Sequence, residues 1–167
     1  RFTYNNVTYN LIDTPGHVDF APEMERAIAV MDAAILIISA VEGIQGHTET
    51  VWQLLRKHSV PTYIFINKTH REGANIDAVI ADLQREFSNA VLFISDDQAA
   101  VMETIASTDE ELMEAYFEGS LTEESMYASM TEQIASSHMF CVMSGSALQD
   151  IGVLPFFELI TKTTKPY

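Results

Sequence analysis

Apolar and polar positions follow two different periods along the chain. Mostly apolar segments predict five strands, at residues 7–12, 33–39, 62–66, 90–94 and 139–143. Elsewhere apolar residues recur three or four positions apart, which predicts helices at residues 22–31, 48–57, 76–87, 108–117, 122–136 and 153–160. The uninterrupted apolar run at 33–39 is typical of a strand buried on both faces of a parallel sheet. The alternation of strands and helices predicts an α/β fold with helices on both faces of the sheet.

Single residues predict where several of these elements begin or end. Asn5 and Asn6 separate two short strand-like segments at the start of the chain and suit a two-residue hairpin turn, because asparagine tolerates positive φ. Asn75 suits the N-cap of the helix that follows it. Residues 108–111 (Thr-Asp-Glu-Glu) match a capping box, and Gly119 suits the end of the helix that this box opens.

Length and composition are those of one globular domain. A chain of 167 residues buries about 70% of its unfolded surface. No run of 18 or more apolar residues occurs, so we expect no membrane partner. The single cysteine, Cys141, lies in an apolar strand segment, which predicts a buried core thiol. One cysteine allows no internal disulfide, which is consistent with the cytoplasm.

Charge is distributed unevenly along the chain. Residues 86–161 hold 14 acidic side chains and no Lys or Arg, and so account for nearly all of the net charge of −15. Such a surface repels phosphate backbones, which argues against direct nucleic-acid binding by this half. Two interpretations stay open: a solvated acidic face, or a docking surface for a protein partner.

One short string carries the most chemical information. Residues 13–20 read Asp-Thr-Pro-Gly-His-Val-Asp-Phe and follow the predicted strand at 7–12. Asp13 is therefore expected at the carboxyl end of a strand, where open α/β sheets place their ligand crevice. A carboxylate there suits Mg²⁺, usually through water. Gly16 would let the backbone approach a phosphate closely and donate its N–H.

This string resembles the metal and γ-phosphate motif of translational GTPases such as elongation factor G. Residues 64–68 (Ile-Phe-Ile-Asn-Lys) resemble the start of that family's guanine-reading N-K-x-D motif. Residues 144–148 (Ser-Gly-Ser-Ala-Leu) resemble its S-A-K/L loop. The resemblance runs from the first residue to the last, with a compact acidic insert at about 86–137. It implies a partial GTP-binding domain with a three-layer P-loop GTPase-like sheet, and GTP or GDP with Mg²⁺ as ligands.

The resemblance also implies a role for each matched residue. His17 would orient the attacking water, and Asp13 would anchor the metal near the phosphate contacted by Gly16. Asn67 and Lys68 would contact the nucleotide, and the fourth motif position, occupied by His70, would face the base. The backbone N–H groups of the S-A-K/L loop would reach the guanine oxygen from Ser146, Ala147 and Leu148.

Part of the family's machinery is missing from the sequence. No G-x-x-x-x-G-K-[ST] string occurs, and the chain begins with Arg rather than Met. That loop supplies the phosphate cradle, its lysine and a Mg²⁺-binding hydroxyl. We therefore expect a fragment, truncated at its N-terminus, that binds no cofactor and hydrolyses no GTP by itself. Loss of the central phosphate-loop strand would leave unpaired backbone groups, so we expect a strand rearrangement or a second chain, as in a strand-swapped homo-oligomer.

His70 departs from the family pattern, because it stands where the family has the aspartate that reads guanine. A carboxylate accepts two hydrogen bonds from the base, whereas a neutral imidazole offers one donor and one acceptor. Three explanations stay open: Asp77 or another acid substitutes, the base preference is relaxed, or nucleotide binding is lost.

Two kinds of protein fit these observations. The first is a ribosome-associated, cytoplasmic GTPase, either like the tetracycline-resistance ribosomal protection proteins, which the compact insert favours, or like elongation factor G, which residues 42–50 favour. The second is a degenerate relative that hydrolyses nothing and binds a protein partner through its acidic insert.

Overall fold

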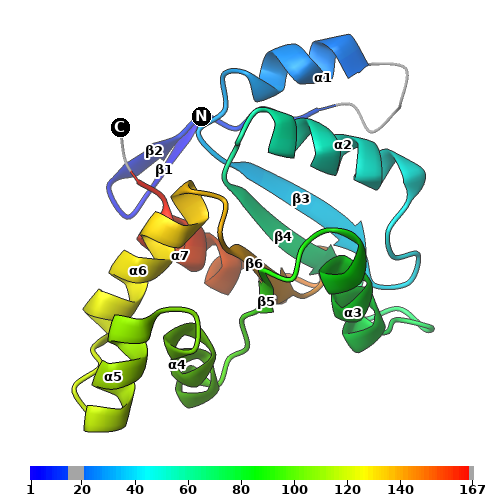
Figure 1. Cartoon of the computed structure of the whole chain (residues 1–167). Coiled ribbons are helices and arrows are strands. Elements are labelled where there is room, and N and C mark those ends of the chain that lie inside the picture. The colour runs from blue at the N-terminus through cyan, green and yellow to red at the C-terminus, as the bar shows by residue number, and fades with distance from the viewer. Residues whose placement is uncertain (15–20, 166–167) are drawn as a thin grey trace.

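A computed structural model describes residues 1–14 and 21–165. Figure 1 shows the arrangement of its elements. In chain order they are β1 Phe2–Tyr4, β2 Val7–Tyr9, α1 Ala21–Ile28, β3 Ala34–Ser39, α2 Gly46–Lys57, β4 Thr62–Asn67, α3 Ile76–Glu86, β5 Val91–Phe93, α4 Gln98–Ala106, α5 Glu110–Glu118, α6 Glu123–Ala135, β6 Phe140–Ser144 and α7 Val153–Thr163.

Four strands form one parallel sheet in the order β3-β4-β6-β5. β4 occupies an inner position and pairs along its whole length with β3, from Ala34 opposite Thr62 to Ser39 opposite Asn67. On its other side, Ile66 lies opposite Ser144 of β6. Because the strands are parallel, their carboxyl ends lie at the same edge of the sheet.

Helices cover both faces of this sheet, which confirms the predicted three-layer α/β fold. On one face, Trp52 of α2 and Leu83 of α3 pack over side chains of β3, β4 and β6. On the other, α4, α6 and α7 enclose a second cluster that includes Tyr63 and Phe65 of β4. Alternate residues of β4 point to opposite faces, and five of its six residues are buried.

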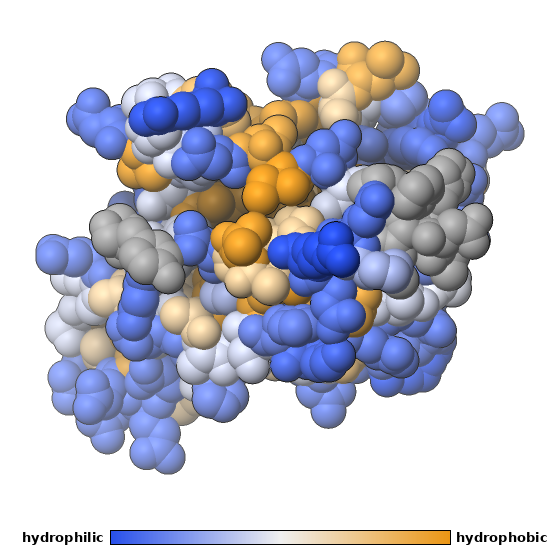
Figure 2. Space-filling model, turned by 90° about the horizontal axis from the view of Figure 1, so that it is seen from above, coloured by the Kyte–Doolittle hydropathy of each residue, from blue (hydrophilic) through white to orange (hydrophobic). Residues whose placement is uncertain are grey.

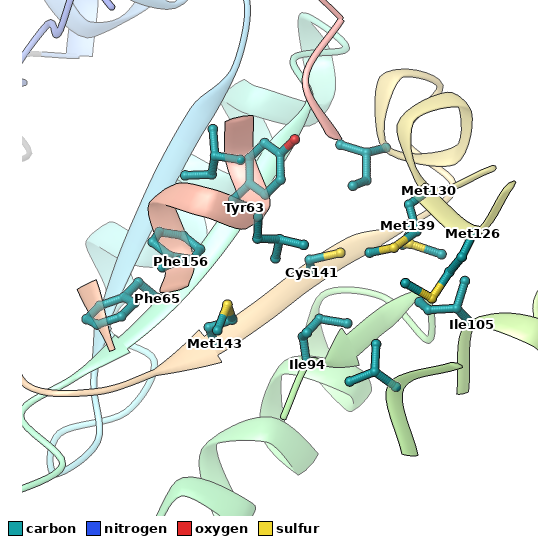
Figure 3. Packing of buried hydrophobic residues seen from close by; sticks show 14 of the residues in the cluster. Tyr63, Phe65, Ile94, Ile105, Met126, Met130, Met139, Cys141, Met143 and Phe156 are labelled. Carbon is teal, nitrogen blue, oxygen red and sulfur yellow. The ribbon is translucent and has the colours of Figure 1, made fainter. Parts of the chain in front are cut away.

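The second cluster is rich in sulfur (Figure 3). Met126 and Met130 of α6 and Met139 are at most 1% exposed, and Cys141 is completely buried. Burial raises the pKa of the Cys141 thiol to about 12. The prediction that this cysteine is an inert core thiol is confirmed.

The first two strands form a hairpin outside the main sheet. Asn5 and Asn6 have φ of 48° and 63°, which confirms the predicted turn. The hairpin packs on α7, where the ring of Phe2 lies 5.4 Å from that of Phe157. β2 ends at Tyr9, whereas the pattern predicted a strand through residue 12. Residues 10–14 are without regular structure, so that prediction was wrong in its extent.

β3 is an edge strand, because its other side has no hydrogen-bonded neighbour among the described residues. Ile35 is 40% and Ile37 63% exposed, so the expectation that this strand is buried on both faces was wrong. Among the described residues β2 pairs with β1 and with no strand of the main sheet, so a strand rearrangement that fills the sheet is not seen there. Figure 2 shows apolar side chains gathered at the centre of one face. Within the first 39 residues, the exposed large apolar side chains include Leu11, Ile12, Val30, Ile35 and Ile37.

Residues 86–137 contain β5 and the helices α4, α5 and α6. Asp109 caps α5 by accepting from the backbone N–H groups of Glu111 and Leu112, and Gly119 ends it with φ of 73°. The sequence pattern predicted no helix at α4. Phe117, on α5, is 79% exposed.

None of the described helices is both long and apolar enough to cross a membrane.

Met130 provides a direct test of this packing. Met130→Ala should lower the free energy of unfolding by about 2–5 kcal/mol, because truncation leaves a cavity among fully buried neighbours. Met113→Ala, at a side chain that is 38% exposed, should change it by about 0.5 kcal/mol or less. Urea denaturation measures both, and equal losses for the two variants would contradict the described core.

Candidate functional site

Polar residues gather where three adjacent strands end. β3, β4 and β6 end at Ser39, Asn67 and Ser144. Backbone hydrogen bonds continue beyond these ends: Ala40 N donates to Asn67 O over 2.8 Å, and Gly145 N donates to Ile66 O over 2.9 Å. The three loops therefore leave the sheet side by side, as the position of a ligand crevice in an open α/β sheet requires.

The loop after β6 closes on itself. Ser146 N donates to Ile151 O, and Ile151 N donates to Ser146 O, both over 2.9 Å. This closure brings the chain so close that a Cβ on Gly145 would lie 2.1 Å from Ile151 O, and one on Gly152 2.5 Å from Ser144 O. Only glycine leaves room at these two positions, so the shape of the loop depends on them.

Asn67 joins this loop to β4. Its side-chain oxygen Oδ1 accepts a hydrogen bond from Ala147 N over 3.0 Å. A second bond between the same two loops runs from Thr69 N to Gly145 O over 3.2 Å. The structure therefore brings together the two strings that the sequence singled out separately.

His70 reaches the same loop through its side chain. The distance from His70 Nδ1 to Ser146 Oγ is 2.6 Å. Ser146 is fully buried, whereas His70 is exposed. Ser146 Oγ also accepts a bond from Gln149 N over 3.3 Å. The imidazole is thus anchored at one nitrogen to a buried hydroxyl.

Lys68 and Leu148 lie at the solvent-exposed rim of these loops. Lys68 adopts a positive φ of 64°, and its Nζ lies 3.8 Å from Glu42 Oε2. Both side chains of this pair are well exposed, so the pair contributes little to stability. Leu148 is 83% exposed. Neither side chain packs into the core, and both are accessible to a ligand.

The structure does not support the expected position of Asp13. Because β2 ends at Tyr9, Asp13 lies four residues beyond the strand rather than at its end. Its side chain is exposed and makes no hydrogen bond or ion pair with another described residue. Gly16 and His17, expected at the phosphate and the attacking water, lie outside the described residues.

Sequence reasoning missed two contributors to the site. Glu42 contacts Lys68 from the loop after β3, a pairing that depends on strand order and has no signal in the sequence. No structural role was predicted for Gly152, although it shares the close approach with Gly145. The available signal was the glycine itself at both positions, because a residue without a Cβ lets another part of the backbone approach closely.

Comparison with known proteins decides the family. The family model described as elongation factor Tu GTP binding domain matches residues 1–166. The chain belongs to this family. It is thus a G domain of the translational GTPase kind, as the resemblance of its three motifs implied.

Several tetracycline resistance proteins are similar to this G-domain chain. It is 30% identical to TetW of Butyrivibrio fibrisolvens over 178 residues, covering 99% of the chain and 28% of that protein. It is 34% identical to TetM of Streptomyces lividans over 173 residues, covering 94% of the chain and 27% of that protein. Identity to TetP of Clostridium perfringens is 48% over 91 residues, 54% of the chain and 14% of that protein. The chain therefore spans just over a quarter of the length of TetW and TetM.

A solved structure supports the fold of the G domain. A crystal structure of a protein from Thermus thermophilus superposes with a TM-score of 0.78 at 24% identity. The match covers 92% of this chain and 29% of that chain. At this level of identity the likeness establishes the architecture of the sheet and helices.

Gly145 tests whether close backbone contact shapes the loop. Gly145→Ala places a Cβ against the Ile151 carbonyl, so it should displace residues 145–152 and lower the free energy of unfolding by about 1–3 kcal/mol. The amide resonances of Ser146 and Ala147 should shift in a ¹H–¹⁵N correlation spectrum. Gly46→Ala is the matched control, because nothing lies within 4 Å of that Cβ. Unchanged loop resonances in Gly145→Ala would refute the described loop.

Proposed function

We propose that this chain is part of the GTP-binding domain of a ribosome-associated, cytoplasmic translational GTPase. The observation that carries the proposal is the bond from Ala147 N to Asn67 Oδ1, which joins the two loops that the family uses at the base. The family match over residues 1–166 supports it independently. The names of TetW, TetM and TetP favour the tetracycline-resistance type over the elongation factor G type.

In this proposal the described residues hold the base end of GTP or GDP. Asn67 keeps the two loops together, the stem of Lys68 lies along the base, and the backbone N–H groups of residues 146–148 face the base oxygen. Of these, Ser146 N is bonded to Ile151 O and Ala147 N to Asn67. Leu148 N makes no hydrogen bond to another described residue. Leu148 N is therefore the donor available to a ligand oxygen.

The phosphate end depends on Asp13, Gly16 and His17. Asp13 is exposed and carries a carboxylate, which suits Mg²⁺ that retains most of its water. When bound, Mg²⁺ would neutralise charge on the phosphates. The sequence holds no G-x-x-x-x-G-K-[ST] string to cradle them. This supports the proposal that the chain alone binds no nucleotide and hydrolyses none, and that activity belongs to a longer protein acting on the ribosome.

A second candidate function rests on the acidic helices. On α5, Met113, Tyr116 and Phe117 are 38%, 38% and 79% exposed beside four glutamates of the same helix. An exposed apolar group with an acidic rim suits a basic protein partner. A degenerate relative that hydrolyses nothing could use this surface without any nucleotide.

Asn67→Ala in the full-length protein that carries this chain distinguishes the two functions. The variant should bind guanosine diphosphate at least tenfold more weakly by titration calorimetry, because it loses the side-chain bond to Ala147 N that joins the two loops of the base site. Asn89→Ala, at an exposed asparagine, is the control and should bind as the wild type does. Absence of nucleotide binding in the wild type would refute the GTPase and favour the second function.

A further inference from the structure

The hydrogen-bonding options of Ser146 determine the state of His70. The Ser146 residue is 0% exposed, so its hydroxyl hydrogen needs a partner within the protein. The described contacts of Oγ are His70 Nδ1 at 2.6 Å and Gln149 N at 3.3 Å. A backbone N–H can only donate, so Gln149 occupies a lone pair of the oxygen. His70 Nδ1 is then the acceptor available to the hydroxyl hydrogen.

These hydrogen-bond roles select one tautomer of the imidazole ring. A neutral histidine carries one N–H and one acceptor nitrogen. If Nδ1 accepts from Ser146, the proton lies on Nε2, so Nε2 is a hydrogen-bond donor. Nε2 makes no hydrogen bond to another described residue, and the His70 side chain is exposed. The donor is therefore available to a ligand.

The same loops still favour an oxygen at position 6 of a purine. Leu148 N is the backbone donor on the 146–148 loop that is left without a described partner. An adenine would oppose it with the donor of its 6-amino group, whereas guanine presents the acceptor O6. The loops thus still favour a 6-oxo over a 6-amino purine. His70 changes only the contacts at positions 1 and 2 of the ring.

From these observations we propose that His70 inverts the base preference of this site. The site binds a xanthosine nucleotide, whose base is a 6-oxopurine with an oxygen at position 2, more tightly than a guanosine nucleotide. The inference rests on the nucleotide binding proposed above. Guanine would turn two donors, the ring N1–H and the 2-amino group, toward the Nε2–H donor. Xanthine replaces the 2-amino group by an oxygen that accepts from Nε2–H. Both bases keep the N1–H without an acceptor, but guanine adds a second unpaired donor where xanthine gains a hydrogen bond, and this difference favours xanthine.

Calorimetry with four diphosphates tests the proposal on the full-length protein. The wild type should bind xanthosine diphosphate about tenfold or more tightly than guanosine diphosphate, with inosine diphosphate between them and adenosine diphosphate weakest. His70→Asp restores two acceptors and should reverse the order of the first two. His47→Asp makes the same substitution at an exposed histidine of α2 and should keep the wild-type order.

Two further measurements address the mechanism itself. Ser146→Ala removes the hydroxyl that holds Nδ1, so the ratio of the xanthosine to the guanosine affinity should fall toward one. In the nucleotide-free wild type, ¹⁵N chemical shifts of the His70 ring should show the Nε2–H form. A ring protonated on Nδ1 alone would overturn the proposal.

The outcomes separate this inference from the proposed function. If the wild type binds guanosine diphosphate more tightly than xanthosine diphosphate, the inverted preference is refuted and nucleotide binding stands. If neither the wild type nor His70→Asp binds any of the four diphosphates, the proposed function is refuted, and the inference fails with it.

Discussion

The parallel pairing of β4 with β6 determines where every described residue of the base site lies. Because Ile66 lies opposite Ser144, the residue after each of them, Asn67 at the end of β4 and Gly145 just beyond β6, lies at the same height of the sheet. The bonds from Ala147 to Asn67 and between Ser146 and His70 can form only in this register. A shift by one residue would turn the side chains of β4 to the opposite faces and expose its core residues.

Both faces of the sheet protect that register. The apolar cluster under α2 and α3 and the sulfur-rich cluster under α4, α6 and α7 bury β4 from two sides. The loops themselves contain exposed and polar groups, so they contribute little burial. The site therefore consists of polar groups on loops that the buried sheet holds in position. This arrangement suits the fixing of hydrogen-bond donors and acceptors in place.

Sequence patterns predicted the elements that depend on local chemistry. The hairpin turn at Asn5–Asn6, the cap at Asn75 and the end of α5 at Gly119 all follow from backbone preferences of single residues. The exposure of Ile37 and the early end of β2 were not predictable, because they depend on which strands find a neighbour. Likewise, Asn67, His70 and Ser146 could be singled out by motif, while the Ser146–His70 bond required the fold.

The contact between the hairpin and α7 has a consequence for how the chain is made. Tyr4 donates to Glu158 over 3.2 Å and Phe2 lies against Phe157, so the hairpin packs on residues that are synthesised 154 positions later. At a synthesis rate of about 5–20 residues per second, the hairpin waits roughly 8–30 s for its partner helix. During that interval an apolar two-stranded ribbon with open edges is exposed to the cell. The packing of the hairpin is therefore completed only after α7 has been synthesised.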